Sequence, residues 1–245
     1  MKQIVFLLLI LAAAFSCVQS DEAVEEDSDD QESNVVFKRR KDGTISSANQ
    51  VDENNMVHGM RVSYYGDGKT VRSRISVERG IKQGPAIKYY NNGQVFEHIN
   101  YKDGEKHGPC RKYHKNGQLL AVFEYNNGIT LPGLKEYGTD GVLVRDYPEV
   151  QFREIDQLAS KNRIDLEIVC SRKRVKMKYF ILEKEQGDTS RIYLITENGV
   201  ASQRYYLRPG ETLDKRIDII AEIPTEFGNI LVKELSYHLT AKNIN

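Results

Sequence analysis

The side chains best suited to chemistry are aromatic and cationic residues that recur through the middle of the chain. They are Tyr65, Tyr90 and His114, with Lys88, Lys112 and Arg72 beside them. Aromatic rings next to cationic side chains are the usual composition of a protein-binding patch. The pattern therefore predicts a binding face. The alternative interpretation is that these cross-strand aromatic residues only stiffen a sheet.

Signatures of catalysis and of metal binding are missing from the sequence. His58 and His107 stand directly before glycines, which marks them as turn residues rather than ligands. The sequence contains no Cys-x-x-Cys or His-x-x-x-His spacing, no nucleophile elbow and no phosphate-binding glycine loop. We therefore expect no catalytic residue, no metal and no cofactor. A hydrolase acting through His114 is the least favoured alternative.

An internal repeat sets the positions of these side chains. Each copy contains an Asp-Gly or Asn-Gly pair, and the glycines fall 25, 25, 24 and 24 residues apart, at Gly43, Gly68, Gly93, Gly117 and Gly141. A second series marks the return turns at Gly80, Gly104 and Gly128, with Asn55 in the matching position. A third series follows at Gly59, Gly84, Gly108 and Gly133. Asp-Gly and Asn-Gly pairs favour tight hairpin turns, because both residues tolerate positive φ.

Apolar residues alternate between the glycines, which predicts strands with one apolar face. We expect that face to carry Val71, Ile75, Val77, Val95, Ile99, Leu119 and Phe123, together with Ile87 and the tyrosines at 64, 89, 113 and 137. The opposite, polar face would then carry Arg72, Arg74, Lys88, His98 and Lys112. A hairpin with one apolar face gains stability by stacking on its neighbours.

Residues 84–95 and 101–108 carry a resemblance to a known family. Their sequences, GPAIKYYNNGQV and YKDGEKHG, are similar to the MORN-repeat variant family. The resemblance extends over about residues 37–143. It implies a repeat sheet with a binding role. Bacterial proteins of this type are often grouped as YwqK-like antitoxins, which implies the neutralisation of a partner protein.

The glycine period ends at residue 143, and a second region follows. Seven strand-like stretches occupy residues 150–153, 166–171, 176–182, 191–196, 202–207, 217–223 and 230–240. This number of short strands in about a hundred residues predicts an immunoglobulin-like β-sandwich. A short helix within residues 151–162 is an alternative for the first of them. Cys110 and Cys170 each fall in an apparent strand, so we expect small core residues rather than a disulfide.

The N-terminus predicts export. Lys2 precedes an apolar run over residues 4–14, which is too short to span a membrane and typical of a secretory signal. The run ends in Ala14-Phe15-Ser16-Cys17, which resembles the lipobox of bacterial lipoproteins and implies acylation of Cys17. Plain secretion after Ser20 is the alternative. Eight carboxylates within residues 21–32 then predict an extended, disordered tether.

The sequence thus predicts an all-β chain in four parts. These are a lipoprotein signal peptide (1–16), an acidic tether (17–34), stacked hairpin repeats forming an elongated sheet (35–143) and a small β-sandwich (144–245). We expect a lipid-anchored outer-membrane protein, periplasmic or surface-exposed, that is not an enzyme and binds a protein partner through its repeats. An antitoxin or immunity-type inhibitor is the alternative. The formal net charge of zero gives no reason to expect nucleic acid as a partner.

Overall fold

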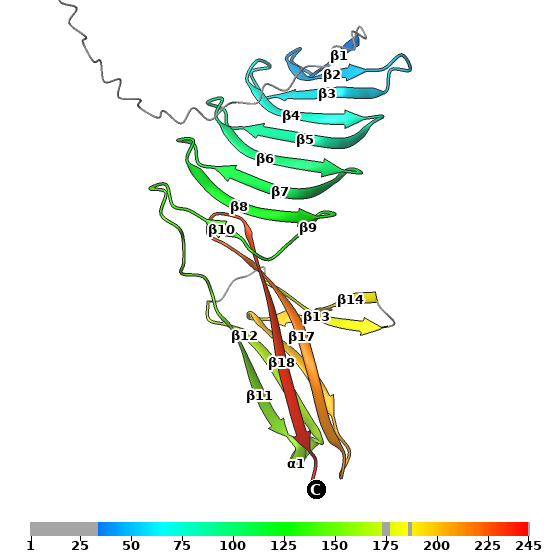
Figure 1. Cartoon of the computed structure of the whole chain (residues 1–245), viewed down its shortest axis with the longest axis vertical. Coiled ribbons are helices and arrows are strands. Elements are labelled where there is room, and N and C mark those ends of the chain that lie inside the picture. The colour runs from blue at the N-terminus through cyan, green and yellow to red at the C-terminus, as the bar shows by residue number, and fades with distance from the viewer. Residues whose placement is uncertain (1–33, 173–176, 186–187, 245) are drawn as a thin grey trace, which may run out of the picture. The chain divides into compact units, whose positions relative to one another are not determined.

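The computed structural model describes residues 34–172, 177–185 and 188–244. The expected signal peptide, the lipidation site Cys17 and the acidic tether up to residue 33 lie outside the described residues, so they stay predictions. The described chain consists of strands, turns and one short helix (Figure 1). Within these ranges, no helix is long and apolar enough to cross a membrane.

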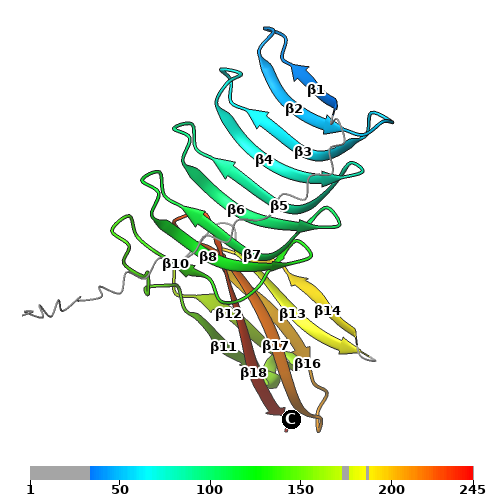
Figure 2. The same cartoon turned by 45° about the horizontal axis from the view of Figure 1, so that its top comes forward.

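An antiparallel meander forms the first half of the described chain, and each strand pairs with the next one in sequence (Figure 2). Its main strands are β1 (Asn34–Arg39), β2 (Ile45–Val51), β3 (Val57–Tyr64), β4 (Val71–Glu78), β5 (Ile81–Tyr89), β6 (Val95–Lys102), β7 (Glu105–Tyr113) and β8 (Leu119–Asn126). Two short strands, β9 (Ile129–Thr130) and β10 (Lys135–Glu136), both pair with β8. This order confirms the prediction of stacked hairpin repeats.

The two kinds of turn use different backbone geometry. In the Asn92-Gly93 turn only the glycine has positive φ (85°), while the Asn92 side chain accepts a hydrogen bond from the Gln94 N–H at 3.2 Å. The Asp or Asn is therefore placed there for its side chain and not for a positive φ, contrary to the expectation from the sequence. At the return turns that contain glycine, two consecutive residues have positive φ, as in Asp103 (51°) and Gly104 (86°). That pair is the mark of a type I′ hairpin.

The strand register defines two faces of the sheet. The inner face carries the most deeply buried apolar residues of the sheet, namely Val77, Ala86, Ile99, Cys110, Ala121 and Phe123. Lys88 lies directly opposite Ser73 and Glu97, so it is on the inner face, because opposed residues project to the same side. Lys112 is opposite Glu97 and Ala121 and is also on the inner face.

This placement corrects the assignment of faces made from the sequence. Lys88 and Lys112 lie on the inner face, whereas Ile87 is opposite His98 on the outer face. The reason is that small residues, such as Ala86, fill the inner positions of the first strand in a hairpin. On the first strand of a hairpin the large apolar residue, such as Ile87, therefore lies on the outer face. On the second strand the large apolar residue, such as Ile99, lies on the inner face.

A β-bulge beside the Asp-Gly or Asn-Gly turns is a second reason why side chains do not simply alternate between the two faces. Lys88 pairs with Glu97 but Tyr89 pairs with Val95, which leaves Phe96 as the extra residue. Val95 therefore follows Tyr89 to the outer face, although its parity matches that of Ile99. The same register shift occurs before Tyr64 and Tyr113.

The remaining strands form two four-stranded sheets. The first contains, in spatial order, β11 (Val150–Gln157), β12 (Arg163–Cys170), β16 (Val200–Tyr206) and β15 (Thr196–Glu197). The second contains β14 (Asp188–Leu194), β13 (Lys178–Glu185), β17 (Thr212–Pro224) and β18 (Ile230–Lys242). In chain order these are the A-B-E-D and C′-C-F-G sheets of an immunoglobulin-type sandwich, as predicted. A short helix, α1 (Leu158–Lys161), lies between β11 and β12.

The two sheets of the sandwich share one apolar core. Leu166 of β12, Tyr179 of β13 and Leu239 of β18 are each 0% exposed and belong to the same buried cluster. Cys110 in the repeats and Cys170 in the sandwich are both buried and not joined in a disulfide, which confirms their prediction as core residues.

Candidate functional site

The side chains that follow each first strand form a column of bonds from one repeat to the next. In each bond a side chain donates to a backbone carbonyl oxygen of the next repeat. The pairs are Arg40 Nη2 with Tyr64 (2.7 Å), Tyr65 Oη with Tyr89 (2.6 Å), Tyr90 Oη with Tyr113 (2.8 Å) and His114 Nε2 with Tyr137 (2.9 Å). We call these four residues the turn column. Arginine, tyrosine and histidine make the same contact because each can donate to a carbonyl one repeat away.

The turn column includes three of the predicted binding residues, and their polar atoms are engaged within the sheet. Tyr65 and Tyr90 are half-buried, and His114 is 7% exposed. The Tyr90 ring packs edge to face against Phe96, with centroids 5.1 Å apart. Arg72, which occupies in its repeat the bulge position of Phe96, is exposed. The turn column thus holds the repeats together, and Arg72 is its freely accessible neighbour.

The other two predicted residues, Lys88 and Lys112, surround a buried carboxylate that sequence reasoning missed. Glu97 is 2% exposed and forms ion pairs with Lys88 Nζ at 2.6 Å and Lys106 Nζ at 4.0 Å. Burial acts to raise the pKa of Glu97, but the hydrogen bond from Lys88 and the charges of Lys106 and Lys112 outweigh it. The net pKa of Glu97 therefore lies below its ordinary value. The sequence did contain a signal for this site. Glu97 stands two residues before the core residue Ile99, so strand alternation places its carboxylate on the inner face.

Lys112 also connects the repeats to the sandwich. Its Nζ donates to Asn229 Oδ1 at 2.6 Å, and Asn229 Nδ2 donates to Glu136 Oε1 at 2.7 Å. Thr225 Oγ1 donates to the same Glu136 oxygen at 2.6 Å. Glu136 is 1% exposed and Asn229 is 2% exposed, so these bonds are shielded from water. The turn between β17 and β18 is thereby fixed to the end of the repeat sheet.

A small cavity of about 300 Å³ adjoins this junction. Glu136, Tyr147, Arg172 and Phe227 are among the residues that line it. Burial, followed by the negative charge of Glu136, raises the pKa of Tyr147 to about 12. Tyr147 therefore stays protonated at physiological pH and cannot serve there as a base.

The outer face carries a continuous row of directly opposed residues. In order across the sheet these are Phe37, Ala48, Val62, Arg74, Ile87, His98, Arg111, Val122 and Lys135. We call this set the outer row. Arg74, Arg111 and Lys135 are exposed, and none of them forms an ion pair within the described ranges. The row mixes cationic and apolar residues, and the sequence pattern had assigned only Arg74 and His98 of it to a polar face.

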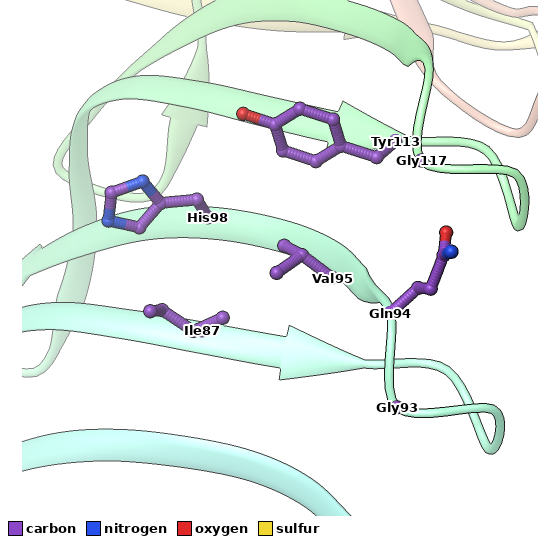
Figure 3. Close-up of a pocket in the computed structure, with 7 residues that line it drawn as sticks. All are labelled: Ile87, Gly93, Gln94, Val95, His98, Tyr113 and Gly117. Carbon is purple, nitrogen blue, oxygen red and sulfur yellow. The ribbon is translucent and has the colours of Figure 1, made fainter.

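A hollow of about 500 Å³ opens on the same face. Ile87 and His98 of the outer row line it together with Val95 and Tyr113, and these side chains gather on one side of the sheet (Figure 3). The turn residues Gly93, Gln94 and Gly117 complete its rim. Val95 faces outward here because of the bulge at Phe96, and Tyr113 faces outward because it follows Lys112 of the inner face. The hollow therefore combines an aromatic ring, aliphatic side chains and an imidazole.

The groups that could bind a metal ion or act as a thiolate can be described for the residues in the described ranges. No group of three or more His, Cys, Asp or Glu among them is arranged to hold a metal ion. Burial raises the pKa of the Cys110 thiol to about 12, so this thiol is not available as a nucleophilic thiolate. His107 contacts the Asn127 side chain at 3.3 Å between Nδ1 and Oδ1.

Comparison with known proteins identifies the type of repeat. Residues 82–103 and 106–127 match the MORN repeat variant family. These two matches fall on β5–β6 and β7–β8, the hairpins that contain the hollow, Glu97 and the outer-row residues Ile87, His98, Arg111 and Val122. No curated protein and no solved structure is significantly similar to the chain.

Proposed function

We propose, starting from these MORN-variant repeats, that the chain is a non-catalytic module that binds a protein partner on the outer face of its repeat sheet. The two matched hairpins supply the outer-row residues Ile87, His98, Arg111 and Val122, and a repeat sheet is an extended surface on which one contact can recur. The proposal assigns the binding role to this face rather than to the turn column.

The observation that carries the proposal is the contrast between the charges of the two faces. On the inner face, Lys88 and Lys106 pair with Glu97, and Lys112 is bonded to Asn229. On the outer face, Arg74, Arg111 and Lys135 are exposed and have no carboxylate partner among the described residues. Charged groups that already have partners stabilise the fold, whereas unpaired cations beside apolar side chains are available to another molecule.

We further propose that the chain is exported and held at the bacterial outer membrane by a lipid on Cys17. The support is the apolar N-terminal run and the lipobox-like residues that end at Cys17. A single acyl chain gives only marginal membrane binding, so stable anchoring requires more than one chain. On this proposal the lipid confines the binding module to the envelope.

Site-specific cross-linking tests the proposal directly. A photo-reactive amino acid is placed at Arg111 on the outer row and, as a matched control, at Ser202, an exposed position on β16. We expect irradiation of intact cells to cross-link one defined partner from position 111 and not from position 202. Equal products from both positions, or none from either, would contradict a partner held on the outer face.

An inhibitor of a partner protein, of the antitoxin or immunity type, would use the same surface. The observation that favours it is the MORN-variant type of the two matched repeats, combined with a face that has unpaired charges. The two functions differ in what the cross-linked partner does. If the partner is toxic on its own and is relieved by this chain, the role is that of an inhibitor. If its activity is the same with and without this chain, the role is that of a scaffold.

A further inference from the structure

Resting on the proposed function, we propose that the outer row binds an extended acidic peptide segment that runs across the strands. The recognising groups are Arg74, Arg111 and Lys135, with His98 as a further cation when it is protonated. All four lie in one line, because each is linked to the next through directly opposed residues.

The spacing of these cations fits a chain that crosses the sheet. Neighbouring strands lie about 4.8 Å apart, so Arg74 on β4 and His98 on β6 are separated by about 10 Å. Arg111 on β7 and Lys135 on β10 are also two strands apart, because β8 lies between them. An extended chain advances about 3.3 Å per residue, so carboxylates three residues apart would match each of these two intervals. His98 and Arg111 lie on neighbouring strands, about 5 Å apart, where one carboxylate can contact both. The whole span from Arg74 to Lys135 then accommodates about seven or eight residues.

The apolar members of the row favour a peptide over a uniformly charged polymer. Ile87 lies between Arg74 and His98, and Val122 lies between Arg111 and Lys135. Beside Ile87 and His98, the hollow formed with Val95 and Tyr113 can receive an apolar side chain. A peptide that alternates acidic and apolar residues satisfies both kinds of position. A nucleic acid or a sulfated polysaccharide would place charged groups next to the aliphatic side chains of Ile87 and Val122.

One carboxylate on the outer face limits how much negative charge the surface accepts. Glu124 is exposed and lies opposite Pro109, in the line of residues next to the outer row. It disfavours a densely charged polyanion by repulsion, but a segment with one carboxylate every third residue can avoid it. The face therefore fits a sparsely acidic segment.

The test is a titration of the purified full-length chain with a fluorescein-labelled ten-residue peptide that has a glutamate at every third position and valine or glycine between them, followed by fluorescence anisotropy. We expect binding at low ionic strength that weakens at about 0.5 M salt, because exposed charge pairs are screened. The double variant Arg74→Glu/Arg111→Glu should bind about tenfold more weakly or worse, since two attractive contacts become repulsive. A labelled ten-residue oligolysine should not bind to this surface.

The matched control is Lys178→Glu/Lys242→Glu, which makes the same change in net charge at two exposed positions of the sandwich. It should change the affinity by less than about twofold, because these sites lie off the outer row. Circular dichroism establishes that each variant is folded. If the row variant is not, Lys135→Glu alone replaces it, with an expected loss of about threefold.

Three results would overturn the inference. These are equal affinity of the parent and the row variant for the acidic peptide, equal losses of affinity in the row and control variants, or binding of heparin or anionic vesicles without binding of the acidic peptide. A cross-linked partner captured from position 111 together with any of these results would leave the binding module intact and reject only its acidic ligand. Failure of the cross-linking as well would reject the proposed function itself.

Discussion

Tyr90 donates a hydrogen bond of 2.8 Å to the backbone carbonyl of Tyr113, which belongs to the next repeat. Tyr90 follows β5 and Tyr113 ends β7, so the bond joins two neighbouring hairpins at their turn ends. Its equivalents at Arg40, Tyr65 and His114 make the turn column a continuous side-chain connection along the sheet. The stability of the repeats should therefore depend on these bonds as well as on the inner-face core.

Tyr90→Phe should lower the free energy of unfolding by about 0.5–1.5 kcal/mol, since it removes one hydrogen bond while keeping the ring. Tyr206→Phe is the matched control, because Tyr206 is 68% exposed. It should change stability by less than about 0.5 kcal/mol. Urea denaturation measures both. Equal effects of the two substitutions would show that the turn column contributes nothing to stability.

Gly93→Ala should destabilise the chain by about 1–2 kcal/mol, because Gly93 has a φ of 85° and a Cβ is strained in that region. Space is not the cause, since an added Cβ at Gly93 meets no atom within 4 Å. Gly66→Ala provides the comparison, because its surroundings are equally open and its φ is not in the left-handed region. That variant should be neutral or slightly stabilised. A loss of stability in both variants would contradict a backbone origin.

Glu97→Gln should lower the free energy of unfolding near neutral pH by about 1–3 kcal/mol, because Lys88 and Lys106 lose their carboxylate partner. The pKa of Glu97 in the folded chain lies below its ordinary value of 4.5. The carboxylate therefore stabilises the fold above about pH 4.5, and this stabilisation is lost as the pH falls through the lower folded pKa.

Urea denaturation of the parent and of Glu97→Gln between pH 3 and pH 7 tests whether this stabilisation decreases as the pH falls. The difference in stability between the two proteins should shrink towards the acidic end of that range. Glu105→Gln, at an exposed carboxylate on β7, controls for the general effect of removing one negative charge. A difference that is constant over the whole pH range would exclude a contribution from ionised Glu97.

Asn229→Ala should loosen the junction between the repeats and the sandwich. The substitution leaves the buried Glu136 and the Lys112 ammonium each without one hydrogen-bond partner, at a cost of about 2–4 kcal/mol. In scanning calorimetry we expect the parent to unfold in one transition and the variant in two, as the halves become independent. A single transition at an unchanged midpoint would mean that the polar junction does not couple them.

Cys17→Ala tests the proposed anchor. If Cys17 is acylated, the parent should incorporate labelled fatty acid and remain with membranes after cell breakage, whereas the variant should do neither. A parent that never takes up label, or a variant that stays in the membrane fraction, would remove the basis for the lipoprotein proposal. Cys110→Ala serves as the comparison, because Cys110 is fully buried and should not affect labelling.

The hairpin repeats could be predicted from the sequence because turns with positive φ demand particular residues. Gly93 and Gly104 sit where the backbone requires glycine, and such positions recur visibly in each copy. The faces of the sheet could not be predicted in the same way. Ile87 and Ile99 are both apolar and lie on opposite faces, so alternation alone did not distinguish the core from the surface.

The polar junction was hidden for a different reason. Glu136 and Asn229 are 93 residues apart in the chain, and no local pattern connects a carboxylate at the end of one region with a turn amide in another. For the sandwich, the prediction followed from the number and length of its strands, and the structure added their order. The sequence placed Arg74 and His98 on a polar face, opposite Ile75 and Ile99, and the strand register agrees with that. The alignment of Arg74 with Arg111 and Lys135 in one row became visible only in the strand register.

The two ends of the repeat sheet differ in whether a hairpin can be added or removed. Among the described strands, β1 has a single neighbour, whereas β8 is followed by β9, β10 and the sandwich that Asn229 fastens to Glu136. A hairpin inserted or deleted next to β1 would leave that fastening untouched, while a change beside β8 would break it. Evolution, or an engineer, can therefore alter the length of the outer row in steps of one repeat from the amino-terminal side alone. The reach of the surface is adjustable there, and its attachment to the sandwich is not.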